Sequence, residues 1–100
     1  MNMKLGSELR RRREAVGLTL RTMAETVHVS PAYLSRVERG KVPPSETLVK
    51  ATARALGVDA KELLLLAGRI PANWRKAIAA SPARAVEVLR EAFGSYVAEP

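Results

Sequence analysis

The chain contains no cysteine and only one histidine, His28, among its 100 residues. The absence of cysteine excludes disulfide bonds and thiolate metal sites. Because His28 has no second ligand at a useful spacing, we predict no metal site and no cofactor. The sequence also lacks a glycine-rich phosphate loop and any cluster of acid and base residues, so we predict no catalytic residue and no enzymatic activity. We expect His28 to be a solvent-exposed turn residue or a phosphate contact.

Aromatic residues and long apolar runs are also scarce. Only four residues are aromatic, and no run of β-branched residues alternates as a strand would. We therefore predict an all-α fold. The longest apolar run covers residues 63–67, far below the ~20 residues that span a bilayer. Because residues 10–13 are all charged and no apolar leader accompanies them, we expect a soluble cytoplasmic protein with no membrane partner.

Positive charge is abundant and unevenly distributed. The formal net charge is +7, and the first 41 residues hold nine lysines and arginines against four glutamates. Residues 42–69 and 70–100 each hold four basic residues against three acidic ones. Basic surfaces bind polyanions by releasing condensed counterions, a term that does not depend on nucleic-acid sequence. The basic surplus therefore points to the first part of the chain as the place where a polyanion would bind.

Residues 18–40 predict two short helices joined by a tight turn. Thr19 is a good N-cap for the first helix, and Ser30 followed by Pro31 is a good start for the second. Gly40 ends the second helix, because glycine readily adopts the left-handed conformation of a C-terminal cap. The apolar residues that recur at helical spacing on the inner faces are Leu20, Met23, Ala24, Val27, Leu34 and Val37. The second of these helices, about residues 30–39, has a narrow apolar stripe and an outer side of small, aromatic and cationic residues, so it can enter a major groove.

The rest of the chain predicts five more helices. A first helix, residues 4–16, turns Leu5, Leu9 and Val16 inward. After the rigid loop 41–45, Ser45 caps a helix whose inner face carries Leu48, Ala51 and Ala55, with Leu56 beside them. Asp59 with Glu62 resembles a capping box at the start of the next helix. A helix follows Pro71, and Ser81 with Pro82 repeats the cap-plus-proline start for the last one. We predict a domain over residues 1–68 and a helical extension over residues 69–100.

Several of these motifs together resemble the phage Cro and repressor family, the xenobiotic response element type of helix-turn-helix regulator. The resemblance rests on residues 9–14, 17–19, 23–24, 29–40 and 55–58 and covers about residues 4–68. It implies a five-helix lambda-repressor-like domain, followed here by a C-terminal helical hairpin, in which the third helix reads operator DNA as part of a symmetric dimer. It also implies a partly buried ion pair between Arg13 and Glu38. The chain departs from the family at Leu20, where many relatives carry a glutamine that contacts phosphate.

The resemblance and the residue chemistry together give a set of DNA-binding candidates. Arg36 is expected either to pair with guanine or to contact phosphate. Tyr33 is expected to contact phosphate or a thymine methyl, or to pack on the loop after Gly40, whereas Ser30 caps its helix and could also bind phosphate. Ala32 has no polar group, so it is expected only to let the helix approach the DNA closely and to make a methyl contact. The expected backbone contacts are Thr19, Arg21, Arg39 and Lys41, with Lys50, Arg10 and Arg11 as further candidates.

The last part of the chain leaves two interpretations open. The apolar residues expected to pack or to form an interface there are Leu65, Leu66, Trp74, Ile78, Val86, Leu89 and Phe93. They either pack only on the chain's own helices or form a dimer interface. The expected function is that of a repressor that binds double-stranded operator DNA as a homodimer. The alternative is a regulator, such as an antitoxin, whose extension binds a partner protein.

Overall fold

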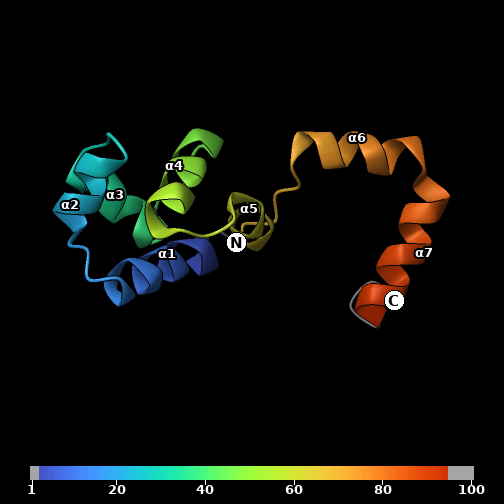
Figure 1. The fold of residues 1–100 in the computed structure, drawn as a ribbon, viewed down its shortest axis with the longest axis horizontal. Coiled ribbons are helices and arrows are strands. Elements are labelled where there is room, and N and C mark those ends of the chain that lie inside the picture. Colours follow the sequence, from blue (N-terminus) through green and yellow to red (C-terminus); the bar gives the residue numbers. More distant parts are fainter. Residues whose placement is uncertain (1–2, 95–100) are drawn as a thin grey trace. The chain divides into compact units, whose positions relative to one another are not determined.

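The computed structural model describes the backbone of residues 3–94 and the side chains of residues 5–94, and this part of the chain contains only helices and turns. The chain divides into two compact units, residues 1–69 and 70–100. The first unit contains α1 (Met3–Ala15), α2 (Leu20–Thr26), α3 (Pro31–Glu38), α4 (Glu46–Leu56) and α5 (Ala60–Leu66). The second contains α6 (Ala72–Ala80) and α7 (Pro82–Phe93). Figure 1 labels these helices along the chain. The all-α prediction is therefore confirmed.

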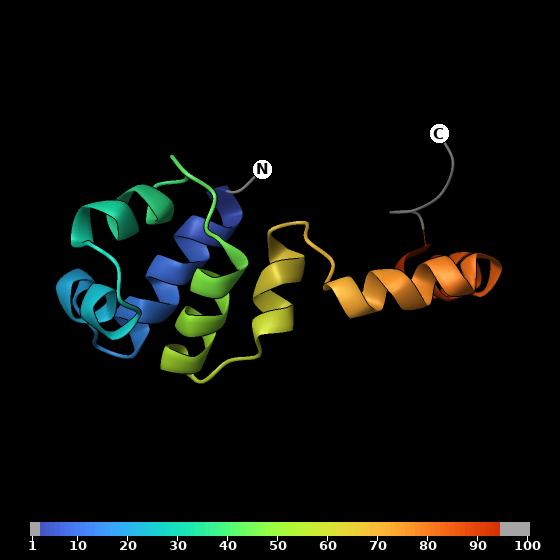
Figure 2. The ribbon, with the colours of Figure 1, turned by 90° about the horizontal axis from the view of Figure 1, so that it is seen from above.

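All five helices of the first unit contribute to one apolar core. In both views of the ribbon, α2 and α3 lie at the opposite end of this unit from α5, while α1 and α4 contact both ends (Figures 1 and 2). The buried apolar side chains are Leu5, Leu9, Met23, Ala24, Val27, Leu34, Val37, Leu48, Val49, Ala53, Leu63 and Leu64. The core therefore fixes the orientation of α2 and α3 relative to the rest of the unit.

Two predicted inner faces differ from the observed ones. Val16 lies after the end of α1 and is 55% exposed, because the chain turns at Gly17 instead of continuing the helix. On α4 the buried residues are Leu48, Val49, Thr52 and Ala53, whereas Ala51 and Ala55 are only half-buried. Thr52 tolerates burial because its hydroxyl donates a 2.7 Å hydrogen bond to the Leu48 carbonyl oxygen.

The helix starts follow the predicted capping residues at four of five positions. The side-chain oxygens of Thr19, Ser30 and Ser45 each accept a backbone N–H bond three residues later, at 3.1 Å. Asp59 also caps its helix as predicted, accepting a bond from the Lys61 amide at 2.9 Å, but the predicted capping box is not completed, because the Glu62 carboxylate pairs with an arginine of α1. The predicted cap at Ser81 is wrong, because Ser81 makes no side-chain capping bond.

Gly6 allows α1 to approach the end of α3 closely. A methyl group at this position would lie 2.7 Å from the Glu38 carbonyl oxygen, and closer still to that of Val37. A real Cβ atom does not tolerate such contact with backbone atoms. Only glycine therefore fits at this crossing of α1 and α3.

Candidate nucleic-acid interface

The turn between α2 and α3 is a Schellman motif with histidine at the left-handed position. His28 has a φ of 61°, and its amide donates to the Glu25 carbonyl while the Val29 amide donates to the Ala24 carbonyl. The other helices of the first unit end with the same pair of bonds, but with glycine at this position. The His28 side chain is exposed, as the sequence predicts for a turn residue.

The two faces of α3 differ sharply in chemistry. Leu34, Val37 and Glu38 are buried, whereas Ala32, Arg36 and the C-cap residue Arg39 are exposed on the opposite side. The outer face thus carries the small side chain of Ala32 beside the guanidinium groups of Arg36 and Arg39. Tyr33 lies between the faces, half-buried and packed against the core cluster. An exposed helix face of this composition can approach a nucleic-acid groove, since nothing large and apolar blocks it.

Four exposed cations of α2, α3 and the residues directly after α3 have no carboxylate partner in residues 5–94. They are Arg21 on α2, Arg36 on α3, and Arg39 and Lys41 directly after it. No ion pair is formed by any of them within that range. Arg39 makes only a long 3.4 Å bond from Nε to the Ser35 carbonyl oxygen. These positive charges are therefore available to phosphate groups.

The remaining candidates on this surface are Thr19 and Ser30, and both are exposed N-cap residues. The Thr19 hydroxyl also donates a 2.9 Å bond to the Thr22 hydroxyl, so it serves first as a cap. Leu20 is half-buried and packs against the core. Since an apolar, packed side chain offers no hydrogen bond, a phosphate at the start of α2 would have to be bound by a neighbour such as Arg21.

Arg13 and Glu38 join α1 to α3 through a buried ion pair. Arg13 Nε donates to Glu38 Oε2 at 2.7 Å and Nη2 donates to Oε1 at 3.0 Å, and both side chains are less than a tenth exposed. Arg13 Nη1 also donates to the Leu18 carbonyl oxygen at 2.8 Å, a contact that was not predicted from the sequence. The hydrogen bonds to Glu38 raise the pKa of Arg13 above its usual range. The pair fixes α3 and the start of the α2 segment to α1 and is turned away from solvent.

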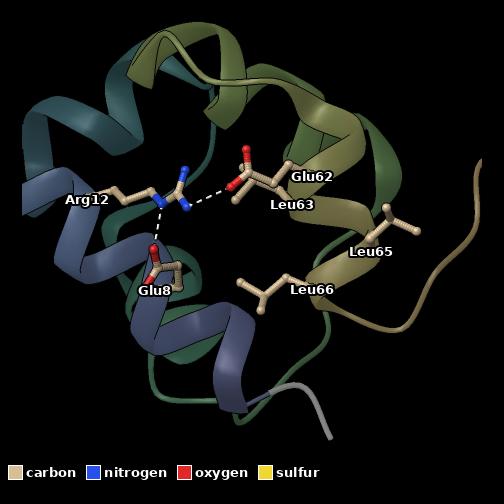
Figure 3. Close-up of a pocket in the computed structure, with 6 residues that line it drawn as sticks. All are labelled: Glu8, Arg12, Glu62, Leu63, Leu65 and Leu66. Carbon is tan, nitrogen blue, oxygen red and sulfur yellow. Dashed lines mark hydrogen bonds and ion pairs between the residues drawn. The ribbon is translucent and has the colours of Figure 1, made fainter. Parts of the chain in front are cut away.

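The neighbouring arginines of α1 are also paired. Arg10 Nε donates to Glu14 at 3.1 Å, and Arg11 Nε donates to Glu8 at 2.9 Å. Arg12 donates from Nε to Glu8 at 2.6 Å and from Nη2 to Glu62 of α5 at 3.1 Å (Figure 3). Hydrogen bonds from Arg11 and Arg12 lower the pKa of Glu8 to about 2. Arg10 and Arg11 are therefore less available to phosphate than the unpaired cations of α2 and α3, and their contact with phosphate stays a prediction. Lys50 is paired as well, with Glu46 at 3.1 Å.

A hollow of about 490 Å³ lies beside the Arg12 network, between α1 and α5. Figure 3 shows Leu65 and Leu66 at its edge, and these side chains are 46% and 37% exposed. In the second unit, Trp74, Ile78, Val86, Leu89 and Phe93 are all exposed as well. The apolar residues predicted for packing or dimerisation are thus on the surface of a single chain.

Two chemical features are absent from the described part of the chain. Among its helices, none is long and apolar enough to cross a membrane. No group of three His, Cys, Asp or Glu side chains within it could hold a metal ion.

Comparison with known proteins adds sequence and structural relatives. A family model described as a helix-turn-helix domain matches residues 4–66. The transcriptional regulator ClgR of Mycobacterium tuberculosis is 37% identical over 79 residues, which cover 79% of this chain and 70% of the relative.

Two solved structures are also similar. The clp gene regulator ClgR from Corynebacterium glutamicum matches with a TM-score of 0.61 and 34% identity, covering 92% of this chain and 93% of its own. The restriction-modification controller protein C.AhdI from Aeromonas hydrophila matches with a TM-score of 0.58 and 34% identity, covering 61% of this chain and 92% of its own. The coverage of the first structure exceeds the 69 residues of the first unit, so that match includes part of the second.

Proposed function

Because the chain belongs to the helix-turn-helix domain family of transcriptional regulators, we propose that it represses transcription by binding an operator with two-fold symmetry as a dimer. The observation that carries the proposal is the outer face of α3. Ala32, Arg36 and Arg39 are exposed there, and the surrounding cations have no carboxylate partner in residues 5–94. In this proposal α3 lies in the major groove, and occupation of the promoter is enough to repress it.

The proposed contacts divide into those that read bases and those that bind the backbone. Arg36 donates to O6 and N7 of a guanine, a geometry that an unpaired guanidinium matches with two parallel bonds. Ala32 lets the helix approach closely, and Tyr33 contacts a phosphate or a thymine methyl at the edge of the face. Arg21, Arg39 and Lys41 bind phosphates, and Thr19 and Ser30 place the N-termini of their helices near the backbone.

A dimer is proposed because one chain presents one reading helix. Two copies related by a two-fold axis would read two half-sites about one helical turn apart, roughly 34 Å. The exposed apolar residues of α5, α6 and α7 supply the surface for such an association. The same residues favour a second candidate, in which the second unit binds a different protein, as an antitoxin does.

Replacing Arg36 tests the assignment of base reading. We expect Arg36→Ala to weaken operator binding by about 1–3 kcal/mol and to relax the preference at one base position per half-site. The measurement is selection of bound sites from random DNA, followed by titration of the selected and scrambled sites at fixed salt. Arg75→Ala, which removes the same charge from α6, is the matched control and should leave the preference unchanged.

Several outcomes of this experiment contradict the proposal. Equal weakening on every sequence would make Arg36 a phosphate contact. Selected sites without an inverted repeat, together with a monomer in sedimentation, would contradict the dimer. Copurification of that monomer with a neighbouring gene's product would favour the partner-binding alternative. Transcription from an operator-bearing promoter that rises when the protein is added would contradict repression.

A further inference from the structure

The helices of the second unit lack the features that stabilise the helices of the first. α6 has nine residues and α7 has twelve, neither has a buried residue, and neither begins with a side-chain capping bond. Isolated helices shorter than about 12–15 residues are marginal in water. Packing against a further surface is therefore needed to stabilise α6 and α7.

The outer surface of α7 has one apolar stripe that is free of charge. Pro82, Val86, Leu89 and Phe93 follow one another at intervals of four, three and four residues, which is the spacing of a helix–helix seam. Val86 is 50% exposed, Leu89 40% and Phe93 53%. The four charged residues of α7 lie around the other side and line a separate polar hollow: Arg84, Glu87, Arg90 and Glu91. Two positive and two negative charges leave this helix with no net charge to repel a second one.

The apolar stripe is symmetric about the middle of α7. A second α7 running in the opposite direction, with the two-fold axis between Glu87 and Val88, brings Val86 of one copy against Leu89 of the other. The same register brings Pro82 against Phe93. An interface with two-fold symmetry requires this kind of reciprocity, because each contact of residue i with residue j occurs twice. A parallel arrangement would instead place each residue opposite its own copy.

We propose that the α7 helices of two copies pair in antiparallel orientation about this midpoint, and that this pairing holds the dimer together. The proposal rests on the dimer of the proposed function and adds its register. Val86, Leu89 and Phe93 are between 40% and 53% exposed, so the stripe offers apolar surface that the same stripe of a second copy can cover. A second copy therefore supplies a cover of the right chemistry and symmetry.

The experiment uses the full chain, which has no native cysteine to interfere. Val86→Cys and Leu89→Cys chains with tags of different mass are mixed, oxidised and separated. We expect the mixed Val86–Leu89 product to exceed both single-variant products, because these positions face one another in the antiparallel register. Phe93→Cys alone should not cross-link, because the two copies of position 93 would be eleven residues apart along the axis. At 1.5 Å per residue that is about 16 Å, beyond the ~7 Å Cα separation of a disulfide.

Each contrary result has a distinct meaning. Efficient self-linking of Phe93→Cys would show a parallel pair and overturn the proposal. Ala92→Cys repeats that test without removing a large apolar side chain, because its two copies would be about 14 Å apart along the axis. A wild-type dimer in sedimentation without the mixed Val86–Leu89 product would overturn the α7 pairing and leave the dimer of the proposed function standing. A wild-type monomer at operator-binding concentrations would overturn both.

Discussion

At the scale of single residues, the most consequential contact is between Arg13 and Glu38. Arg13 belongs to the strongly basic stretch of α1 and Glu38 to α3, so charge alone would place Arg13 among the phosphate contacts. The structure instead buries them together, and Arg13 further binds the Leu18 carbonyl oxygen. Removing one partner of such a pair leaves the other charged, buried and without compensation.

We predict that Glu38→Ala destabilises the first unit by about 3–5 kcal/mol, because it strands the Arg13 guanidinium. The thermal midpoint followed by circular dichroism should fall by more than 10 °C or so. The control is Glu46→Ala, which removes an exposed carboxylate paired with Lys50 and should cost only a few tenths of a kcal/mol. An unchanged midpoint for Glu38→Ala would show that the pair contributes nothing to stability.

At the scale of helical elements, the ends of the helices are where sequence and structure agree best. Thr19, Ser30 and Ser45 start their helices as predicted, because capping depends on a side chain and an amide only three residues apart. The exception among the helix ends is α2, where His28 holds the left-handed position that glycine holds elsewhere in the first unit.

We predict that His28→Gly stabilises the protein by on the order of 0.5–1 kcal/mol, since it relieves the left-handed strain of a residue with a Cβ atom. The measurement is the midpoint of urea denaturation. Gly57→Ala is the matched reverse change, because Gly57 has a φ of 71° and no atom near the added methyl, so only the backbone conformation is penalised. Loss of stability in His28→Gly would mean that the imidazole makes a contact worth more than the strain.

Contacts between elements were harder to derive from the sequence. The spacing of Glu8, Arg11 and Arg12 on one helix indicates local ion pairs. Nothing in the sequence relates Arg12 to Glu62, which lies 50 residues further along and meets it only after α5 packs on α1. The buried face of α4 was placed wrongly for a different reason. Apolar spacing does not mark Thr52 as a core residue, but its hydroxyl is satisfied within its own helix and so can be buried.

At the scale of the whole molecule, the ion-pair network between α1 and α5 makes stability depend on pH. The pKa of Glu8 falls from 4.5 to about 2 on folding. A carboxylate whose pKa is lowered on folding stabilises the folded state at every pH above its pKa in the unfolded chain. This contribution is lost as the pH falls from 4.5 towards 2. We predict that the thermal midpoint of Glu8→Gln falls less steeply across this range than that of the wild type. Glu25→Gln is the control, and its thermal midpoint should change with pH as that of the wild type does. Parallel plots of thermal midpoint against pH for Glu8→Gln and the wild type would contradict the prediction.

The sequence was least informative about the second unit. Its helices were predicted from periodicity and proline placement, and both are present. What covers Trp74, Val86 and Phe93 depends on a surface outside these helices, and periodicity alone left open whether that surface belongs to the same chain or to a second one. Chain order and spacing specify an amphipathic helix, whereas the identity of its partner is a property of the assembly.

The close approach of α1 to α3 at Gly6 has a consequence for how an imperfect operator is tolerated. With no space for even a methyl group between Gly6 and the end of α3, α3 cannot shift towards α1, and if it reads DNA as proposed it cannot adjust in this way to a different groove. When the DNA-binding helix cannot move, the DNA duplex must deform instead, and the free energy of bending it or changing its groove width depends on the DNA sequence. Base pairs that the protein never touches would then influence affinity through the stiffness of the DNA.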